Sequence, residues 1–407
     1  MIHTSDVKPK VYPHNGLGTV TEIDRLQDMS ASVSLNRTKI NEIGRDGAVA
    51  WKAGTPSISL TLRQLEYGNM EFFRQLANKD ASVTKIDLED FKSSWADIAA
   101  YKTEESSGNF LATVWYPKLR TSGFSLNIGD PEASLERNFT LVGEDEFTLQ
   151  GNNKYLIYGE VTCAATGVEN IVLGAGAFLN YPSPVLDPDE SAVYILRVTR
   201  NTAGIETELV LDTDYTYVNG TLTLSILAVT INDIVRFWYS ATTYITGSDP
   251  FTLNDVDAAE LSADCCSIYL ETTNYVYRLQ SVSLDVTYER TDYKEIGNKE
   301  IVLRGARTIT ATITLGRFLE TYSVEEILRG VVAGYGKIDI REFPTTGAKL
   351  VIKVYNNNDK ETFLMGYAIT DCNVTGLEKG IPVDDYVTQN VTLEGSAGHI
   401  VSDELDL

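Results

Sequence analysis

The residue types that perform most protein catalysis are scarce in the middle of this 407-residue sequence. Its three histidines, His3, His14 and His399, lie near the two ends. Histidine-based zinc sites, Ser–His–Asp triads and Cys–His pairs therefore have no histidine available in the central region. The sequence also lacks the G-x-S-x-G, G-x-x-x-x-G-K-S/T and strand-linked G-x-G-x-x-G motifs. We predict a protein that is not an enzyme and that uses no cofactor and no metal.

Carboxylates and cysteines leave weaker alternatives open. The sequence has 57 Asp and Glu, too many to exclude a glycosidase-type pair. The acidic segments 187–190 and 212–214 could hold Ca²⁺, but neither has the spacing of an EF-hand loop, and solvated turns are the favoured interpretation. The neighbours Cys265 and Cys266 are interpreted as ordinary thiols on the two sides of a strand, because four irregularly spaced cysteines do not make a disulfide framework.

The charge balance bears on what the surface repels. With 34 Lys and Arg against 57 Asp and Glu, the formal net charge is −23. A sequence-independent nucleic-acid binder needs cations to displace phosphate counterions, and an anionic membrane surface also repels an acidic chain. No apolar stretch is long enough for a transmembrane helix, and residues 1–16 lack the apolar segment of a signal peptide, so we expect no membrane partner.

An internal repeat gives the clearest signal of how the chain is organised. Residues 25–44 read RLQDMSASVSLNRTKINEIG and residues 278–297 read RLQSVSLDVTYERTDYKEIG, with ten of twenty positions identical. Segments 138–143 and 390–395 then share the pattern N-x-T-L-x-G at nearly the same spacing. The repeat predicts two copies of one unit of about 120 residues, on either side of a third region.

Alternating polar and apolar residues predict two strands in each copy, 28–36 with 57–62 and 281–289 with 308–315. A period of two is typical of half-buried antiparallel strands. In each copy a long polar loop joins the two strands, longer than a simple hairpin needs.

Short helices are expected after these strand pairs. Met70–Leu76 occupies this place in the first copy, and the capping-box sequence Ser323–Glu326 begins a helix in the second. A further helix is predicted at 87–101, where apolar residues recur on one face. More strands are predicted at 109–116, 122–128, 349–355 and 363–374.

The middle region shows no sign of the repeat and is interpreted as an inserted all-β module, with an immunoglobulin-like sandwich as the favoured form. Its strands are predicted at 169–173, 192–199, 206–211, 221–227 and 233–240. The chain is thus expected to be mainly β, each copy being a β-sandwich or barrel with a short flanking helix. The predicted sections are an N-terminal arm (1–24), the first copy (25–150), the inserted module (151–276), the second copy (277–397) and a C-terminal tail (398–407).

The polar faces of the four repeat strands carry hydroxyls, amides and carboxylates but no Lys or Arg. An ordinary solvent-facing sheet mixes both charge signs. DNA that passes such a face meets no cation to hold it. The candidate residues of this face are Asp28, Ser30, Ser32, Ser34, Asn36, Ser57, Ser59, Thr61, Ser281, Ser283, Asp285, Thr287, Glu289, Thr308, Thr310, Thr312 and Thr314.

The repeated unit resembles the tail tube proteins of tailed bacteriophages. The features that carry the resemblance are the strand pair with its long loop, the short helix, the R…EIG entry to the loop and the closing N-x-T-L-x-G strand. It covers both copies and leaves the middle module and the termini aside. It implies a structural virion protein whose β-sandwich domains form rings, with inner sheets joined into a continuous barrel. Stacked rings then form the viral tail tube for DNA ejection.

The resemblance also implies roles for residues and partners. The polar faces would line the lumen, and loops 41–55 and 294–307 would contact the next ring. A duplicated chain implies a homo-oligomer of three chains in a pseudo-hexameric ring, with the inserted module outside the tube. The inter-ring candidates are Glu42, Gly44, Arg45, Trp51, Glu295, Gly297, Asn298 and Arg304.

The implied partners are further copies of the chain and other tail proteins, such as the tape measure, terminator and baseplate proteins, with DNA only as transient, unbound cargo. The implied location is the tail of the virion, after synthesis in the host cytoplasm. Three alternatives remain open. One is a baseplate or tail-completion ring protein of the same fold. Another is a carbohydrate-binding, adhesin-like β protein that binds through Tyr215, Tyr217, Trp238 and Tyr239. The last is a pair of ordinary β-sandwiches with solvent-facing hydroxyls.

Overall fold

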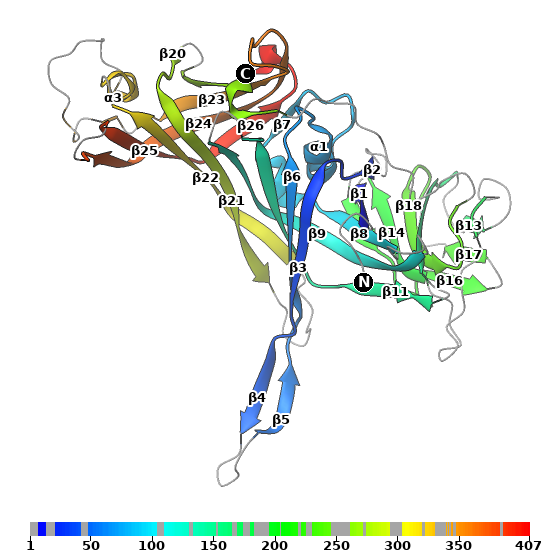
Figure 1. Ribbon diagram of the computed structural model, residues 1–407. Coiled ribbons are helices and arrows are strands. Elements are labelled where there is room, and N and C mark those ends of the chain that lie inside the picture. The colour runs from blue at the N-terminus through cyan, green and yellow to red at the C-terminus, as the bar shows by residue number, and fades with distance from the viewer. Residues whose placement is uncertain are drawn as a thin grey trace. The chain divides into compact units, whose positions relative to one another are not determined.

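The computed structural model describes a mainly β chain with short helices (Figure 1). The prediction of a mainly β fold is confirmed. The described residues are 7–13, 21–41, 48–103, 110–129, 133–151, 154–164, 169–173, 180–182, 195–203, 205–218, 221–224, 230–245, 261–271, 274–293, 303–319, 322–329, 339, 341, 343–344, 347–382 and 386–407.

The chain divides into two compact units. Unit 1 comprises Met1–Ile23, Asp97–Pro117 and Glu146–Asp255, and unit 2 comprises Asp24–Ala96, Lys118–Asp145 and Val256–Leu407. The long strand β9 (Phe110–Ile128) contributes to both. The section borders predicted at residues 25, 151, 277 and 398 stay predictions.

Unit 1 contains the strands of the middle region together with strands from the beginning of the chain. These strands are β1 (Val7–Pro13), β2 (Thr21–Glu22), β8 (Ala96–Thr103), β11 (Phe147–Gln150), β12 (Tyr155–Thr162), β13 (Glu169–Val172), β14 (Ile195–Thr202), β15 (Ile205–Glu208), β16 (Tyr215–Val218), β17 (Thr221–Leu224) and β18 (Ile234–Ala241). Strands β12, β18, β14 and β15 form a four-stranded sheet, and β13, β17 and β16 form a three-stranded one. Buried residues of both sheets, such as Ile171 on β13 and Phe237 on β18, belong to one hydrophobic cluster.

Unit 2 contains the helices and most of the strands of both repeat copies, together with strands from the end of the middle region and from the C-terminal tail. In the first copy these are β3 (Leu26–Ser34), β4 (Arg37–Asn41), β5 (Ala48–Ala53), β6 (Ser57–Leu65), α1 (Glu71–Ala77), β7 (Lys85–Asp87), α2 (Asp90–Ser93) and β10 (Glu136–Gly143). From residue 256 onward they are β19 (Cys266–Leu270), β20 (Asn274–Tyr275), β21 (Leu279–Tyr293), β22 (Leu303–Phe318), α3 (Ser323–Arg329), β23 (Ala348–Tyr355), β24 (Phe363–Gly380), β25 (Thr388–Gly395) and β26 (Ala397–Val401).

One continuous antiparallel sheet runs through unit 2. Its described strands pair in the order β3–β6–β10–β9–β21–β22–β25–β24. Figure 1 shows β3, β6, β9, β21 and β22 running side by side in this sheet. The β9–β21 pairing therefore joins strands of the two copies into one surface.

The two halves of this sheet pair in the same register. Ser30 on β3 lies opposite Thr61 on β6, and Ser283 on β21 lies opposite Thr314 on β22. Each of these residues in the second half follows its counterpart by the spacing of the sequence repeat. The β10–β9 and β25–β24 pairs also agree, each with a register shift at matching positions. Because a register slip of one residue moves every side chain to the other face, matching registers place matching residues on the same face.

A hydrophobic layer covers the opposite face of the sheet in each half. Leu60 and Leu62 of β6 are fully buried, and Phe73 of α1 packs edge-to-face against Phe139 of β10 at a ring distance of 5.1 Å. Val324 and Leu328 of α3 are buried in the second half. Alternation along the strands thus separates a packed face from a polar one.

Two predictions of local structure are wrong. Residues 87–101 form only the short helix α2 and then strand β8, because the residues from Ala96 to Tyr101 are buried without a break. Such a run fits a strand covered on both sides better than a helix with one apolar stripe. Residues 109–116 and 122–128 are not two strands but belong to the continuous β9, within which Lys118 has a positive φ of 52°.

The predicted short helices of the two copies are confirmed as α1 and α3, and no helix in the described ranges has the length and apolar character needed to span a membrane.

Candidate functional site

The polar face of the unit 2 sheet is the candidate site, and alternation along each strand positions its side chains. On β6, the half-exposed Ser57, Ser59 and Thr61 alternate with the buried Ile58 and Leu60. Strand β22 repeats this arrangement with Thr308, Thr310, Thr312 and Thr314. The fold thus places the predicted residues of β6 and β22 on one face, together with those of β3 and β21, in the registers given above.

Strand β3 departs from the prediction of a half-buried strand. Ala31 and Val33 point to the apolar side of the sheet, yet both are exposed, and Val33 has 47% of its surface accessible. The matching Val286 of β21 is only 1% accessible. The sequence pattern is the same in both strands, but β21 has a neighbour on each side in the sheet, whereas β3 pairs only with β6 among the described strands.

Sequence reasoning missed part of this face. Ser125 and Asn127 of β9 and Asn138 and Thr140 of β10 also lie on it, as the register of these strands with β6 requires. Thr392 of β25 takes the matching place in the second half. The N-x-T-L-x-G segments already alternate in this sense, so the signal for β10 and β25 was present in the sequence.

A cation on this face corrects the expectation that it carries none. Strand β6 extends to Leu65, and Arg63 therefore falls on the polar face, opposite Asp28 and Asn138. Its guanidinium lies 3.4 Å from the carboxylate of Glu136. The charge of Arg63 is thus compensated within the face, and the surplus of charge there remains negative.

The acidic residues of the face lie near hydroxyls. Thr308 donates a hydrogen bond of 2.8 Å to the Glu289 carboxylate. Burial raises the pKa of Asp285, which lies opposite Ser125 of β9 and Thr312 of β22. Hydroxyl and carboxylate groups of this kind keep a surface hydrated and mildly negative, and they offer phosphate groups no counter-charge.

The described parts of the predicted inter-ring loops are mostly strand. Strands β4 and β5 pair as a hairpin that continues from β3 and β6 (Figure 1), and β21 and β22 extend as a hairpin to the Tyr293–Leu303 pair. Trp51 lies on β5 with 57% of its surface exposed, and the ammonium of Lys39 sits 5.3 Å from its ring centroid. Arg304 lies in β22 opposite Asp292. The candidates Glu42, Gly44, Arg45, Glu295, Gly297 and Asn298 lie outside the described residues.

A buried ion network anchors each half of the sheet beneath the polar face. In the first half, Arg137 donates to Gln64 at 2.9 Å and pairs with Glu66 at 3.3 Å, and both ionic side chains are fully buried. Tyr367 donates to the same carboxylate at 2.8 Å. Burial lowers the pKa of Arg137, but Glu66, Tyr367 and Tyr67 together outweigh that effect and the pKa is raised, so the guanidinium stays charged.

The second half holds a related network with two residues exchanged. Arg317 donates to Gln389 at 3.0 Å and to Glu325 at 2.6 Å. By register, Arg317 takes the place of Gln64, and Gln389 takes the place of Arg137. Both halves therefore have an Arg–Gln contact at this position, but the strand that carries the arginine in one half carries the glutamine in the other.

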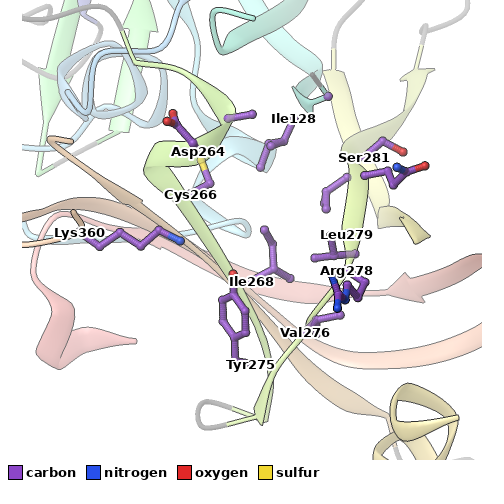
Figure 2. Close-up of a pocket in the computed structure, with 14 residues that line it drawn as sticks. Ile128, Asp264, Cys266, Ile268, Tyr275, Val276, Arg278, Leu279, Ser281 and Lys360 are labelled. Carbon is purple, nitrogen blue, oxygen red and sulfur yellow. The ribbon is translucent and has the colours of Figure 1, made fainter. Parts of the chain in front are cut away.

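A pocket of about 270 Å³ lies between the turn before β19 and the beginning of β21 (Figure 2). Its charged lining residues are Asp264, Arg278 and Lys360. Cys266 also lines it, and burial raises the pKa of this thiol, so the nucleophilic thiolate is scarce. We find in these side chains no pairing of a nucleophile with a base.

Among the described residues, no group of three or more His, Cys, Asp or Glu side chains could hold a metal ion. Segment 187–190 lies outside those residues, and segment 212–214 forms a turn in which Asp214 accepts a hydrogen bond from the Val210 N–H. Cys265 and Cys266 are free thiols, but both are buried, because Cys265 lies in a 3₁₀ turn and not on the outer side of a strand.

The aromatic residues suggested for glycan binding are mostly in the interior. Tyr215, Trp238 and Tyr239 have at most 5% of their surface exposed, and Tyr217 is half-buried. Rings packed inside a protein are not available to stack on a sugar. The adhesin interpretation based on these four residues is therefore wrong.

Comparison with known proteins gives weak structural likenesses only. No protein-family model and no curated protein matches the chain. One similar solved structure is a chain of the anti-feeding prophage baseplate, with 16% identity and a TM-score of 0.26 over 35% of this chain and 92% of that one. Another belongs to the sheath–tube complex of an extracellular contractile injection system, with 15% identity and a TM-score of 0.28 over 37% of this chain and 100% of that one.

Proposed function

We propose that this chain is a structural subunit of a phage-tail-like assembly, the major tail tube protein, and that the polar face of the unit 2 sheet lines the bore. The observation that carries the proposal is the single, continuous sheet with one packed face and one face of hydroxyls, amides and carboxylates. A conduit for DNA must let phosphates pass without binding them, and such binding needs surface cations. Arg63, a cation that β6 places on this face, is held by Glu136.

The proposal includes an internal duplication, in which each half of the sheet acts as one tube domain. The equal registers of the two halves support it, as does the Arg–Gln exchange between Gln64/Arg137 and Arg317/Gln389. Three chains would then supply six matching sheet segments, and the ring would be pseudo-hexameric. Closure into a barrel removes the exposed edges that a sheet of this length otherwise leaves.

The proposed partners are further copies of the chain, in the same ring and in stacked rings. Other tail proteins, such as the baseplate, tape measure and terminator proteins, are proposed partners as well. The hairpin β4–β5, with exposed Ile40 and Trp51, is the proposed contact to the next ring. DNA is cargo only. The proposed place of action is the assembled tail.

Negative-stain electron microscopy of the purified chain tests this proposal. We expect rings or tubes with a central bore once the protein is concentrated. A chain that stays monomeric at high concentration would contradict it. In particles purified from their source, a tube subunit should be among the most abundant proteins, whereas one ring per particle would favour the alternative of a baseplate or tail-completion protein.

A further inference from the structure

The two halves of the unit 2 sheet are joined inside the chain by β9 and β21. This internal joint places Phe124 opposite Val286, Ser125 opposite Asp285 and Ile128 opposite Val282. The apolar members are well covered, with Phe124 4%, Val286 1% and Ile128 6% exposed. The internal joint therefore buries the apolar sides of both strands.

The outer edges of the same sheet are formed by the counterparts of these two strands. Strand β3 pairs with β6 in the same register as β21 pairs with β22, so β3 corresponds to β21. In the same way, Asn373–Gly380 of β24 pairs with β25 as Arg120–Asn127 of β9 pairs with β10, so these two segments correspond. Val33, the counterpart of Val286, is 47% exposed, and Ile381, which directly follows β24 and is the counterpart of Ile128, is 78% exposed. Each outer edge thus displays apolar residues that are buried where the internal joint exists.

We propose that β24 of one chain pairs antiparallel with β3 of a second copy, in the register of the internal joint. Leu377 then lies opposite Val33, Glu378 opposite Ser32 and Ile381 opposite Met29. This inference rests on the proposed ring and names the contact that closes it. Strand addition at an exposed sheet edge supplies main-chain hydrogen bonds, and side chains on alternate positions supply specificity.

The polar residues at the joint support this register. At the internal joint a hydroxyl on β9, Ser125, faces an acid on β21, Asp285. At the proposed joint the order is reversed, with the acid Glu378 on β24 and the hydroxyl Ser32 on β3. Each pair therefore avoids two carboxylates in direct opposition, which would destabilise the strand pairing.

A glycine at the same position of both joints gives a second, independent similarity between the internal joint and the proposed one. A Cβ atom at Gly123 would lie 2.7 Å from the backbone oxygen of Val286, so β9 and β21 approach each other too closely for a side chain there. Gly376 holds the corresponding place on β24, although within one chain a Cβ atom there meets only Thr392 at ordinary contact distance, 3.4 Å. The structure of the single chain does not require this glycine, whereas the proposed joint does, against Val33 of the second copy.

An arginine at the same position of both joints is a third similarity between them. At the internal joint, Arg290 donates to the backbone oxygens of Thr121 at 2.7 Å, Phe91 at 2.9 Å and Lys92 at 3.1 Å. Its counterpart in the repeat is Arg37, which is exposed. In the proposed joint Arg37 reaches the backbone oxygen of Val374, the counterpart of Thr121, in the second copy.

Disulfide trapping tests the register. Directly opposed residues of antiparallel strands have Cα atoms about 4.5–5.5 Å apart, within disulfide range. We expect oxidised Ser32→Cys/Glu378→Cys protein to form covalent oligomers up to a closed ring. The matched control is Asp28→Cys/Glu378→Cys, because Asp28 lies on the same face roughly 13 Å further along β3, and about tenfold less cross-linking is expected there. The intrachain pair Ser125→Cys/Asp285→Cys checks the chemistry at the internal joint.

The variant Gly376→Ala provides a second measurement. We expect a folded monomer with unchanged thermal unfolding but with assembly shifted to at least about tenfold higher concentration, since the added methyl group meets a backbone atom of the second copy. Arg37→Ala should shift assembly in the same direction, while Arg63→Ala, an exposed arginine one strand further in, should leave it unchanged.

The outcomes separate this inference from the proposed function. Rings that form but do not cross-link at Ser32/Glu378, or that cross-link better at Asp28/Glu378, would overturn the joint and leave the tube proposal standing. A chain that forms no ring at all would overturn both.

Discussion

At the scale of single residues, Arg137 and Glu66 form a fully buried ion pair in the core of unit 2. Neither side chain is accessible to water, and the carboxylate also accepts hydrogen bonds from the Tyr67 and Gly68 backbone and from Tyr367. Removing one partner of a buried pair leaves an uncompensated charge, which costs far more than the pair itself contributes.

The variant Glu66→Gln should therefore lower the free energy of unfolding by about 3–5 kcal/mol, because Arg137 keeps its charge in a dry site. Urea denaturation followed by fluorescence measures this loss. The control is Glu136→Gln, which breaks the exposed pair with Arg63 and should cost under about 1 kcal/mol. Equal losses in the two variants would contradict the role given to the buried network.

His399 on β26 predicts a dependence of stability on pH. Burial lowers its pKa, and the charges of Lys85 and Lys349 lower it further. The folded state thus favours the neutral imidazole, so its contribution to stability is complete above the unfolded pKa of about 6.5 and declines as the pH falls toward the lower folded value.

Thermal unfolding of the intact chain and of His399→Gln at neutral and mildly acidic pH checks this expectation. The intact chain should lose more stability on acidification than the variant does. An identical pH dependence in both proteins would show that the imidazole titrates as it does in the unfolded chain.

At the scale of elements, the β9–β21 joint holds the two halves of the sheet together. Replacing Gly123 by alanine places a methyl group 2.7 Å from the Val286 oxygen, and the backbones must move apart. We expect Gly123→Ala to destabilise the folded chain by about 1–3 kcal/mol. Denaturant unfolding measures this, and Gly129→Ala, where an added Cβ atom meets nothing within 4 Å, is the matched control.

The strands that carry the site were predictable because local alternation defines them. Ser57–Leu62 and Thr308–Leu315 lie where the pattern of the sequence places them, with the hydroxyls on one face. The helices after them were also predictable. The pattern failed at Ala96–Tyr101, where apolar residues at helical spacing belong to a strand buried on both sides.

Local sequence patterns did not predict which strands pair when those strands lie far apart in the chain. The sequence repeat indicates two equal units but contains no signal that β9 of one pairs with β21 of the other. Nor does alternation tell an edge strand from an inner one: Val33 and Val286 have the same pattern and opposite burial. The position of Arg63 on the polar face depends on how far β6 extends, and strand ends are poorly defined by sequence.

At the scale of the whole molecule, the net charge of −23 and the composition of the polar face lead to the same expectation about DNA. The chain should show no measurable binding to double-stranded DNA even at low salt, where electrostatic binding is strongest. Fluorescence anisotropy with a labelled duplex measures this. In assembled rings, Thr312→Lys should create salt-sensitive DNA binding, and Thr312→Val should not.

The central claim is that the hydroxyl face of the unit 2 sheet forms the wall of a bore. A cryo-electron microscopy map of the assembled chain, at a resolution that shows side chains, tests it most directly. The account predicts a closed barrel in which Thr312 and Ser283 face the lumen and α1 and α3 lie on the outer side of the wall. A map in which this face points outward, or in which Lys and Arg side chains line the lumen, would contradict it.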